Sequence, residues 1–278
     1  MNAKTYARAL TIAGSDSGGG AGIQADLKTF SALGCYGMSA ITALTAQNTV
    51  AVTAIHPLPP EFVARQIDAV MDDIGVDAVK IGMLHNAEII YTVAERLAHY
   101  DVSNVVLDPV MVAKSGDRLL QQEAVDALRE ALIPLVTVLT PNLPEAGVLL
   151  GQTIEGDAQF EESCRRLAEL GPKAVLLKGG HLGGTSSPDY LYVPGEEMLQ
   201  LQAERVETKN IHGTGCTLSS AIAAYLARGE EIAGAARKAK EYITRALQEG
   251  AAYRLGGGHG PVHHFYSWWD SDDPAIIG

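Results

Sequence analysis

Short apolar runs rich in β-branched residues alternate along the chain with longer segments of helical period. Six runs are predicted to be buried strands because nearly every position in them is apolar, and they cover residues 8–14, 38–47, 77–83, 104–110, 136–142 and 173–180. Residues 61–75 repeat apolar side chains at helical spacing and end at Gly75, a common helix stop. The alternation predicts an α/β fold with a mostly parallel sheet covered by helices on both faces.

One segment departs from this alternation. Residues from Asp189 to Val206 indicate a hairpin around Pro194-Gly195, which would add antiparallel strands at one edge of the sheet. No repeat, low-complexity block or Pro/Ser-rich linker divides the chain, so residues 1–278 are expected to form a single domain. The tail after Phe265 is acidic and contains a proline, and roughly its last 10 residues are expected to be poorly ordered.

Composition and charge limit the classes of partner. The chain has 47% hydrophobic and 19% charged residues, as globular proteins do, and no apolar run approaches the roughly 20 residues of a membrane span. The N-terminal residues lack the pattern of a signal peptide, so a cytoplasmic location is expected. The net charge of -12 and the lack of a Lys/Arg-rich run argue against nucleic acid and anionic membranes as partners. Three widely spaced cysteines predict free thiols.

Glycine and polar residues follow the predicted strands. In an open parallel sheet, ligands bind beyond the carboxyl ends of the strands. The residues found there are Gly14-Ser15-Asp16, Gln47-Asn48, Gly82-Met83, Asp108-Pro109, Asn142 and Lys178-Gly179-Gly180. We therefore expect the loops at this edge to carry the function.

The glycine-rich stretch from Gly14 to Phe30 allows three interpretations. A dinucleotide fingerprint can be placed on Gly20-x-Gly22-x-x-Ala25, but no acidic residue for a ribose follows between Ser39 and Val52. The loop could instead bring backbone amides close to a flat or polar substrate, with Asp26 one helical turn beyond Gly22. It could also be a turn needed only for packing.

A second glycine loop, Gly213-Thr214-Gly215-Cys216-Thr217, precedes a predicted helix. Glycines at a helix start leave backbone N–H groups directed at one point, where the helix dipole adds positive potential, so an anion can bind without a lysine. An ordinary capped helix is the alternative. The chain has no Gly-Lys pair and hence no Walker loop. Cys216 lies in this loop, where a thiol can have a lowered pKa, although a lone cysteine is more often a small buried apolar residue.

Charged residues near the strand ends are candidates for binding phosphate and metal. Asp108 ends a strand and Glu145 lies in the first turn of a predicted helix, and such oxygen ligands suit Mg²⁺, although an acid also favours a helix N-terminus by itself. Lys178 beside two glycines could reach phosphate oxygens, or it could be a surface lysine. Three histidines, His259, His263 and His264, lie among glycine and proline, which indicates a surface turn rather than a metal site.

Seven strings resemble, in order, the hydroxymethylpyrimidine kinase and phosphomethylpyrimidine kinase family of thiamin biosynthesis, within the ribokinase-like superfamily. They are AGSDSGGGAGIQADLKTF, TALTAQNT, DPVMVAKSGDRLL, TPNLPEA, LLKGGH, HGTGCTLSSAIAA and GHGPVHHF, and the resemblance as a whole covers about residues 8 to 266. The resemblance implies a ribokinase-like fold, a homodimer, and ATP-dependent phosphorylation of 4-amino-5-hydroxymethyl-2-methylpyrimidine and then of its monophosphate.

The resemblance also implies roles for individual residues. The pyrimidine contacts of the family match Gly14, Ala21, Asp26, Gln47, Met83 and Val110. Asp108 and Glu145 match positions associated with Mg²⁺, Lys178 matches a residue on the phosphate side, and residues 110–120 match a loop that closes over the site. Gly213, Gly215 and Cys216 match the loop that holds the transferring phosphoryl group. The superfamily usually has aspartate as the base where this chain has Cys216, so a thiolate or a hydrogen-bonding thiol is expected to serve the acceptor hydroxyl.

Two other functions remain open at this stage. Some relatives phosphorylate pyridoxal on the same scaffold, but those tend to carry a second cysteine in the closing loop, and Val110 to Leu120 contains none. A ligand-binding regulator without catalysis is the second alternative, and the intact set of Asp108, Glu145 and Lys178 argues against it.

Overall fold

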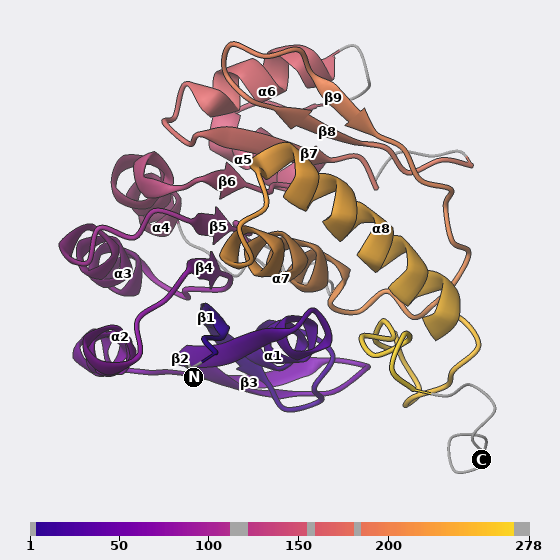
Figure 1. Ribbon diagram of the computed structural model, residues 1–278, viewed down its shortest axis with the longest axis horizontal. Coiled ribbons are helices and arrows are strands. Elements are labelled where there is room, and N and C mark those ends of the chain that lie inside the picture. The colour runs from indigo at the N-terminus through magenta and orange to yellow at the C-terminus, as the bar shows by residue number, and fades with distance from the viewer. Residues whose placement is uncertain (1–3, 112–121, 155–158, 181–184, 270–278) are drawn as a thin grey trace.

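The fold is built around one sheet of nine strands, seen nearly end-on in Figure 1. The computed structural model describes residues 4–111, 122–154, 159–180 and 185–269. Most of the expected closing loop and the tail from residue 270 lie outside this part of the chain.

The six predicted strands are all present in the sheet. Its strands are β1 (Ala7–Asp16), β2 (Cys35–Gln47), β3 (Val52–Pro57), β4 (Ala78–Ile81), β5 (Val105–Leu107), β6 (Val138–Leu139), β7 (Ala174–Lys178), β8 (Asp189–Tyr192) and β9 (Leu199–Leu201). They lie in the order β3-β2-β1-β4-β5-β6-β7-β8-β9, and those from β2 to β7 pair in parallel.

Antiparallel strands close both edges of the sheet, whereas the sequence predicted them at one edge only. The expected hairpin is β8 and β9, paired antiparallel to each other and to β7. The unexpected strand, β3, pairs antiparallel to β2 at the opposite edge. Its residues were not recognised as a strand because most of them are solvent-exposed, which leaves no run of apolar positions.

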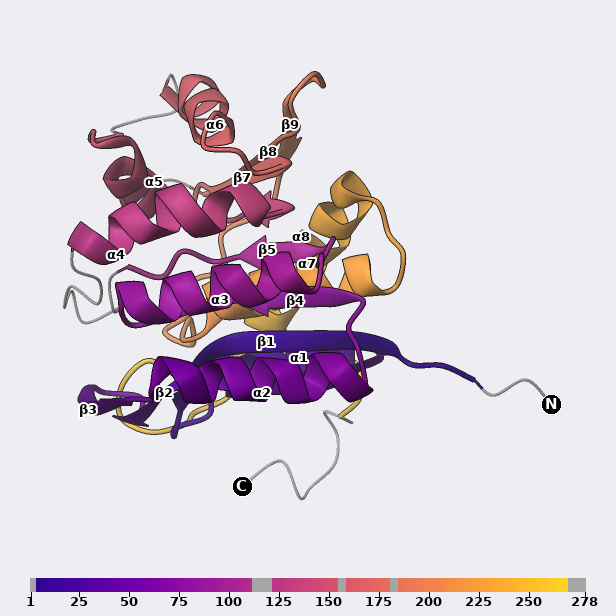
Figure 2. The same ribbon diagram turned by 90° about the vertical axis from the view of Figure 1, so that its left-hand side faces the viewer.

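Helices cover both faces of the sheet. They are α1 (Gly22–Ala32), α2 (Pro60–Asp73), α3 (Ala87–His99), α4 (Gln122–Ala127), α5 (Leu143–Leu150), α6 (Phe160–Ala168), α7 (Thr214–Ala227) and α8 (Ile232–Gly250). A π-helical segment and a 3-10 turn, Leu128–Leu132 and Ile133–Leu135, follow α4. Figures 1 and 2 show α2, α3 and α4 on one side of the sheet, and Figure 1 shows α7 and α8 on the other. The predicted helix at 61–75 is α2, and it ends before Gly75, which has φ of +71°.

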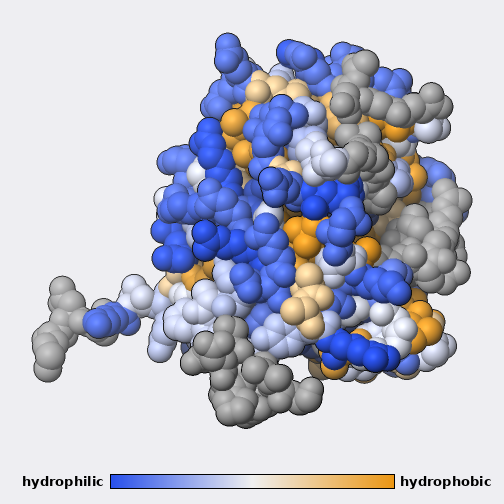
Figure 3. All heavy atoms as spheres, turned by 90° about the vertical axis from the view of Figure 1, so that its right-hand side faces the viewer, coloured by the Kyte–Doolittle hydropathy of each residue, from blue (hydrophilic) through white to orange (hydrophobic). Residues whose placement is uncertain are grey.

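The core has two parts, one on each face, because side chains along a strand alternate in direction. On the central strand β1, Leu10 and Ile12 pack with the core under α2 to α6, while Ala9 packs with the core under α1, α7 and α8. Helix α8 buries only one side, so the face of the molecule on its side is largely hydrophilic, with hydrophobic residues in small separate patches (Figure 3). Among the described residues, no helix has the length and apolar character that crossing a membrane requires.

Candidate active site

The predicted site residues gather where the parallel strands end. Asp108 follows β5, Asn142 and Glu145 begin α5 after β6, and Lys178 ends β7. The first turn of α7 reaches the same edge: a methyl group added to Gly215 would lie 3.3 Å from Oδ2 of Asp108 and 3.4 Å from Nζ of Lys178. The sheet edge therefore brings the loop of α7 and the charged residues together.

Three charged side chains form the centre of this cluster. Nζ of Lys178 lies 2.6 Å from Oδ1 of Asp108 and 3.9 Å from Oε2 of Glu145, and all three side chains are largely buried. Lys178 is thus not the solvated surface lysine that the sequence left open. With two carboxylates and one ammonium group, the cluster has an excess of negative charge.

The position of Glu145 follows from the start of α5. The side chain of Asn142 accepts a hydrogen bond from the backbone N–H of Glu145 at 2.9 Å, and Oε2 of Glu145 accepts one from the N–H of Asn142 at 2.8 Å. This reciprocal capping box satisfies two helix N–H groups and holds the carboxylate toward Lys178. The helix-capping role and the site role of Glu145 are therefore compatible.

Burial shifts the proton equilibria of this cluster. The pKa of Glu145 is raised from 4.5 to about 7, mainly because burial penalises its charge; Lys178 opposes the shift and Asp108 adds to it. The pKa of Lys178 is also raised, because the two carboxylates outweigh the effect of its burial. Near neutral pH, Lys178 is charged and Glu145 is partly protonated, so a cation that approaches Glu145 would favour loss of its proton to water.

The loop before α7 has the geometry of an anion site. Gly213 has φ of +78°, and a Cβ there would collide with the carbonyl oxygen of Gly20, so only glycine allows this close approach of two loops. The N–H of Thr217 donates to Gly213 at 2.8 Å, whereas within the described residues the N–H groups of Gly215 and Cys216 have no acceptor. They lie at the positive end of α7, beside Lys178.

Cys216 does not have the acidic thiol that its place at a helix start suggested. Burial raises the pKa of this thiol above its usual value, and the charge of Lys80 and a hydrogen bond from the N–H of Gly22 compensate only in part. Asp26 and Asp108 raise the pKa further. The raised pKa favours a neutral thiol near neutral pH, which is the hydrogen-bonding alternative that the sequence left open beside a thiolate.

The glycine-rich stretch before α1 is folded around Asp16. This carboxylate accepts hydrogen bonds from the N–H groups of Gly18, Gly20 and Ala21, at 2.8, 3.0 and 2.8 Å, and from Nε2 of His212 at 2.8 Å. Burial tends to raise the pKa of Asp16, but the hydrogen bonds prevail and lower it. The backbone amides that a dinucleotide would need are thus already bonded to Asp16. The hydrogen bond between Asp16 and His212 also joins this loop to the residue before Gly213.

Several of the residues expected to contact a pyrimidine lie near the hydrogen bond between Asp16 and His212. A Cβ on Gly14 would lie 2.6 Å from the methyl carbon of Met83, so glycine makes room for that side chain. The amide nitrogen of Gln47 is 3.4 Å from Nε2 of His212, and its amide oxygen accepts from Thr45 at 3.2 Å. Ala21 borders the same loop, and the N–H of Val110 donates to the carbonyl of Asp108 at 2.8 Å.

Asp26, the sixth expected pyrimidine contact, is buried beneath the site. It is fully inaccessible and pairs with Lys80, whose Nζ is 2.8 Å from both of its oxygens. The hydroxyls of Thr11 and Ser220 also donate to it, each at 2.6 Å. These four hydrogen bonds fill the acceptor positions of the carboxylate, so in this structure Asp26 braces the elements under the site and does not face a ligand.

Sequence reasoning missed Lys80 and His212 and did not assign a role to Asp16. Lys80 could have been noticed, because a lysine inside the apolar run Ala78–Ile81 must be paired if the strand is buried. No local pattern identified the partner of Lys80, which is Asp26 of α1, or the partner of His212, which is Asp16 of β1.

The three histidines near the C-terminus differ in burial: His259 is exposed, His263 is half-buried and His264 is buried. Within the described residues, no group of three or more His, Cys, Asp or Glu side chains could hold a metal ion. His264 is buried with its pKa lowered to about 3 by burial, and its Nε2 lies 3.1 Å from the hydroxyl of Thr217. It is a neutral residue that packs against the first turn of α7.

The family model for phosphomethylpyrimidine kinase matches residues 16–263. The chain belongs to the phosphomethylpyrimidine kinase family. Over 262 residues it is 53% identical to the hydroxymethylpyrimidine/phosphomethylpyrimidine kinase of Rhizobium meliloti, covering 94% of this chain and 98% of that protein.

Solved structures give the same ribokinase-like fold. The crystal structure of phosphomethylpyrimidine kinase from Clostridium difficile 630 is 48% identical, with a TM-score of 0.77, and the match covers 86% of this chain and 99% of that one. Pyridoxal kinase from Staphylococcus aureus, in complex with AMP-PCP and pyridoxal, is 34% identical with a TM-score of 0.87, and the match covers 95% and 96% of the two chains. The family therefore shares its fold with kinases of a second ring alcohol.

Replacing Lys80 is expected to destabilise the fold strongly. Lys80→Met leaves the carboxylate of Asp26 buried without a counter-charge, which costs about 3–5 kcal/mol, and Lys80→Met/Asp26→Asn should recover part of this loss. Urea unfolding measures both. Arg165→Met, which breaks the exposed pair with Glu161, is the control and should cost at most ~1 kcal/mol. A Lys80→Met variant as stable as the control would contradict the buried pair.

The raised pKa of Glu145 predicts a pH-dependent stability. Because the folded state holds this proton more tightly than the unfolded chain, stability present below pH 4.5 is lost as pH rises toward about 7. Glu145→Gln keeps an oxygen for the N–H of Asn142 but has no proton to lose. Without metal and nucleotide, its melting temperature should gain on that of the unchanged chain by about 2–4 °C or more between pH 5 and pH 8. A difference that does not change with pH would exclude the shift.

Proposed function

We propose that the chain transfers the γ-phosphoryl group of ATP to the hydroxymethyl group of 4-amino-5-hydroxymethyl-2-methylpyrimidine, and then phosphorylates the resulting monophosphate. The observation that carries this proposal is the contact of the Gly213–Cys216 loop with Lys178 and Asp108, next to the loop fastened by Asp16 and His212. The membership of the family and the AMP-PCP bound to the pyridoxal kinase of Staphylococcus aureus support it.

The α7 end of the site is suited to the transferring phosphoryl group. The N–H groups of Gly215 and Cys216 and the ammonium of Lys178 can bind phosphate oxygens, because they are fixed donors at a positive helix end. In phosphoryl transfer, positioning and charge stabilisation account for most of the acceleration, so a strong base is not required.

Magnesium fits the two acidic residues. Asp108 and Glu145 offer oxygen ligands with an excess of negative charge, and Mg²⁺ is usually held by one or two carboxylates together with substrate phosphates. Bound there, Mg²⁺ would neutralise charge on the phosphate oxygens. Its binding would also favour the ionised form of Glu145.

The other end of the site is suited to a polar ring. Gln47 offers a donor and an acceptor, which suit a ring nitrogen and an exocyclic amine, and Met83 offers an apolar surface. Asp16 holds the side chain of His212 in place. The amide of Gln47 lies beside this side chain and therefore borders a group of fixed position. We also propose, from the family resemblance, that the enzyme is a cytoplasmic homodimer.

Pyridoxal is the second candidate substrate, because pyridoxal kinases share the fold at a TM-score of 0.87. The lack of a cysteine between Val110 and Leu120 favours the pyrimidine. Identity is also higher to the pyrimidine kinase, at 53%, than to that pyridoxal kinase, at 34%.

A coupled assay of ADP formation tests the substrate. We expect ADP with the hydroxymethylpyrimidine and with its monophosphate, at kcat/KM about tenfold or more above that with pyridoxal, since a site with mismatched polar groups discriminates at least this strongly. Lys178→Met, purified identically, controls for contaminating kinases and should form little ADP. ADP with pyridoxal alone would establish the second candidate, and no ADP with any alcohol would favour a regulator.

The neutral thiol of Cys216 predicts a hydrogen-bonding role for this residue. Cys216→Ser, which keeps a hydrogen-bonding group, should retain kcat within roughly tenfold, whereas Cys216→Ala should lose about 100-fold, the lower range for a group that handles the proton of the acceptor. Steady-state kcat for both variants, with KM for each substrate, measures this. A near-normal kcat in Cys216→Ala would remove the residue from the chemistry.

A further inference from the structure

A buried ion pair on the far side of Lys178 has no part in the proposed chemistry. Lys240 of α8 and Asp189 of β8 lie 2.8 Å apart, with side chains 11% and 4% exposed. Other charged residues of α8, such as Arg237, Lys238 and Glu241, are exposed to solvent. Burying two charges is a costly way to hold a helix, because an apolar pair of similar size usually stabilises at least as well.

The hydrogen bonds of this pair hold both ends of the connection between β7 and β8. Oδ1 of Asp189 accepts from the N–H of Gly179 at 3.0 Å, immediately after Lys178. Nζ of Lys240 donates to the carbonyl of Ser187 at 2.7 Å, two residues before β8. One pair thus fixes the chain directly after Lys178 and directly before β8.

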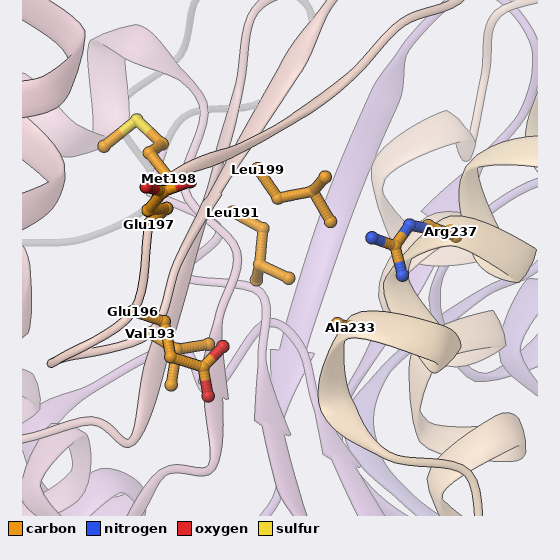
Figure 4. Close-up of a pocket in the computed structure, with 8 residues that line it drawn as sticks. All are labelled: Leu191, Val193, Glu196, Glu197, Met198, Leu199, Ala233 and Arg237. Atoms are coloured by element: carbon orange, nitrogen blue, oxygen red, sulfur yellow. The ribbon is translucent and has the colours of Figure 1, made fainter.

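Apart from this pair, apolar side chains of α8 and of the hairpin meet in the core under α1, α7 and α8. Helix α8 packs chiefly on α7. One turn before Lys240, Arg237 faces Leu191 and Leu199 across a hollow of about 210 Å³ (Figure 4). Beside this apolar contact, the pair of Lys240 and Asp189 is the ion pair that joins α8 to β8 in the described part of the chain.

Lys178 is held from both directions as a result. Its own N–H donates to the carbonyl of Pro141 at 2.9 Å, and the next N–H is held by Asp189. Fixing the backbone on both sides sets the position from which the side chain extends, and its Nζ lies 2.6 Å from Oδ1 of Asp108. The stem of a lysine is flexible, so a fixed backbone position makes the location of its ammonium group more precise.

We propose that Lys240 and Asp189 are positioning residues that hold Lys178 at the phosphate end of the site. The proposal rests on the proposed function, since it assigns Lys178 to phosphate oxygens. Neither residue touches the reacting atoms; both act through the backbone at Gly179.

A double-mutant cycle tests the connection. The variants are Lys240→Met, Lys178→Met and their combination, with Lys238→Met, an exposed residue of the same helix, as the control. We expect Lys240→Met to lower kcat/KM for ATP about tenfold with KM for the pyrimidine unchanged, and the control to stay within about twofold. In the Lys178→Met background, Lys240→Met should change kcat/KM by less than about twofold, because the residue it positions is already gone.

Two further measurements distinguish a loss of positioning from a folding defect and from the use of a wrong substrate. Lys240→Met/Asp189→Leu leaves no charge buried alone and no acceptor for the N–H of Gly179, so it should fold where Lys240→Met does not, and it should show at least the same loss. Calorimetric titration with AMP-PCP repeats the cycle without turnover, so it remains informative if no tested alcohol is phosphorylated. Independent effects of Lys240 and Lys178 in both measurements, or a double variant with unchanged kcat/KM and nucleotide affinity, would overturn the positioning role.

Discussion

The buried carboxylate of Asp26 joins the elements that lie beneath the site. It lies on α1 and receives hydrogen bonds from Thr11 of β1, Lys80 of β4 and Ser220 of α7. Thr11 and Lys80 are partners in neighbouring strands, so the sheet presents both to the carboxylate at once. Because a buried charge is tolerated only when fully paired, the four elements can assemble in one relative arrangement. That arrangement sets α7, and hence the Gly213–Cys216 loop, at a fixed height above the strands.

Above these elements, the site has two separate ends, and the two ends meet at one backbone contact. The proposed phosphate end consists of helix amides, Lys178 and two carboxylates, and its charged side chains are largely buried. The proposed ring end consists of Gln47, Met83 and the loop organised by Asp16. Gly213 and Gly20 touch where the two ends meet, and a side chain at Gly213 would force them apart. The distance between a bound ring and a bound phosphate is therefore set by backbone, which changes less than side chains do.

The sequence allowed most of the fold to be predicted because parallel strands buried on both faces are almost wholly apolar and stand out. The edge strand β3 escaped because its positions are largely exposed. For the site, the spacing of residues after strand ends located Asp108, Glu145 and Lys178 correctly. For Cys216 the sequence left burial and reactivity both open, and for Asp26 it gave no sign of burial, because burial depth is not visible in sequence. Burial raises the pKa of the Cys216 thiol at the start of α7. Burial also makes the carboxylate of Asp26 a partner of groups beneath the site. The roles of individual residues in catalysis remain predictions.

The bonds that define the site join residues that are very far apart along the chain. Asp16 and His212 are separated by 196 positions, and Asp26 and Ser220 by 194. During synthesis, β1, α1 and β4 leave the ribosome long before α7 exists, so Asp26 and Lys80 wait for a partner that only the last quarter of the chain supplies. Closing so large a loop is entropically unfavourable until the intervening strands have aligned. If the α7 loop holds the phosphates as proposed, a nascent chain gains the ability to bind nucleotide only when its final helices dock.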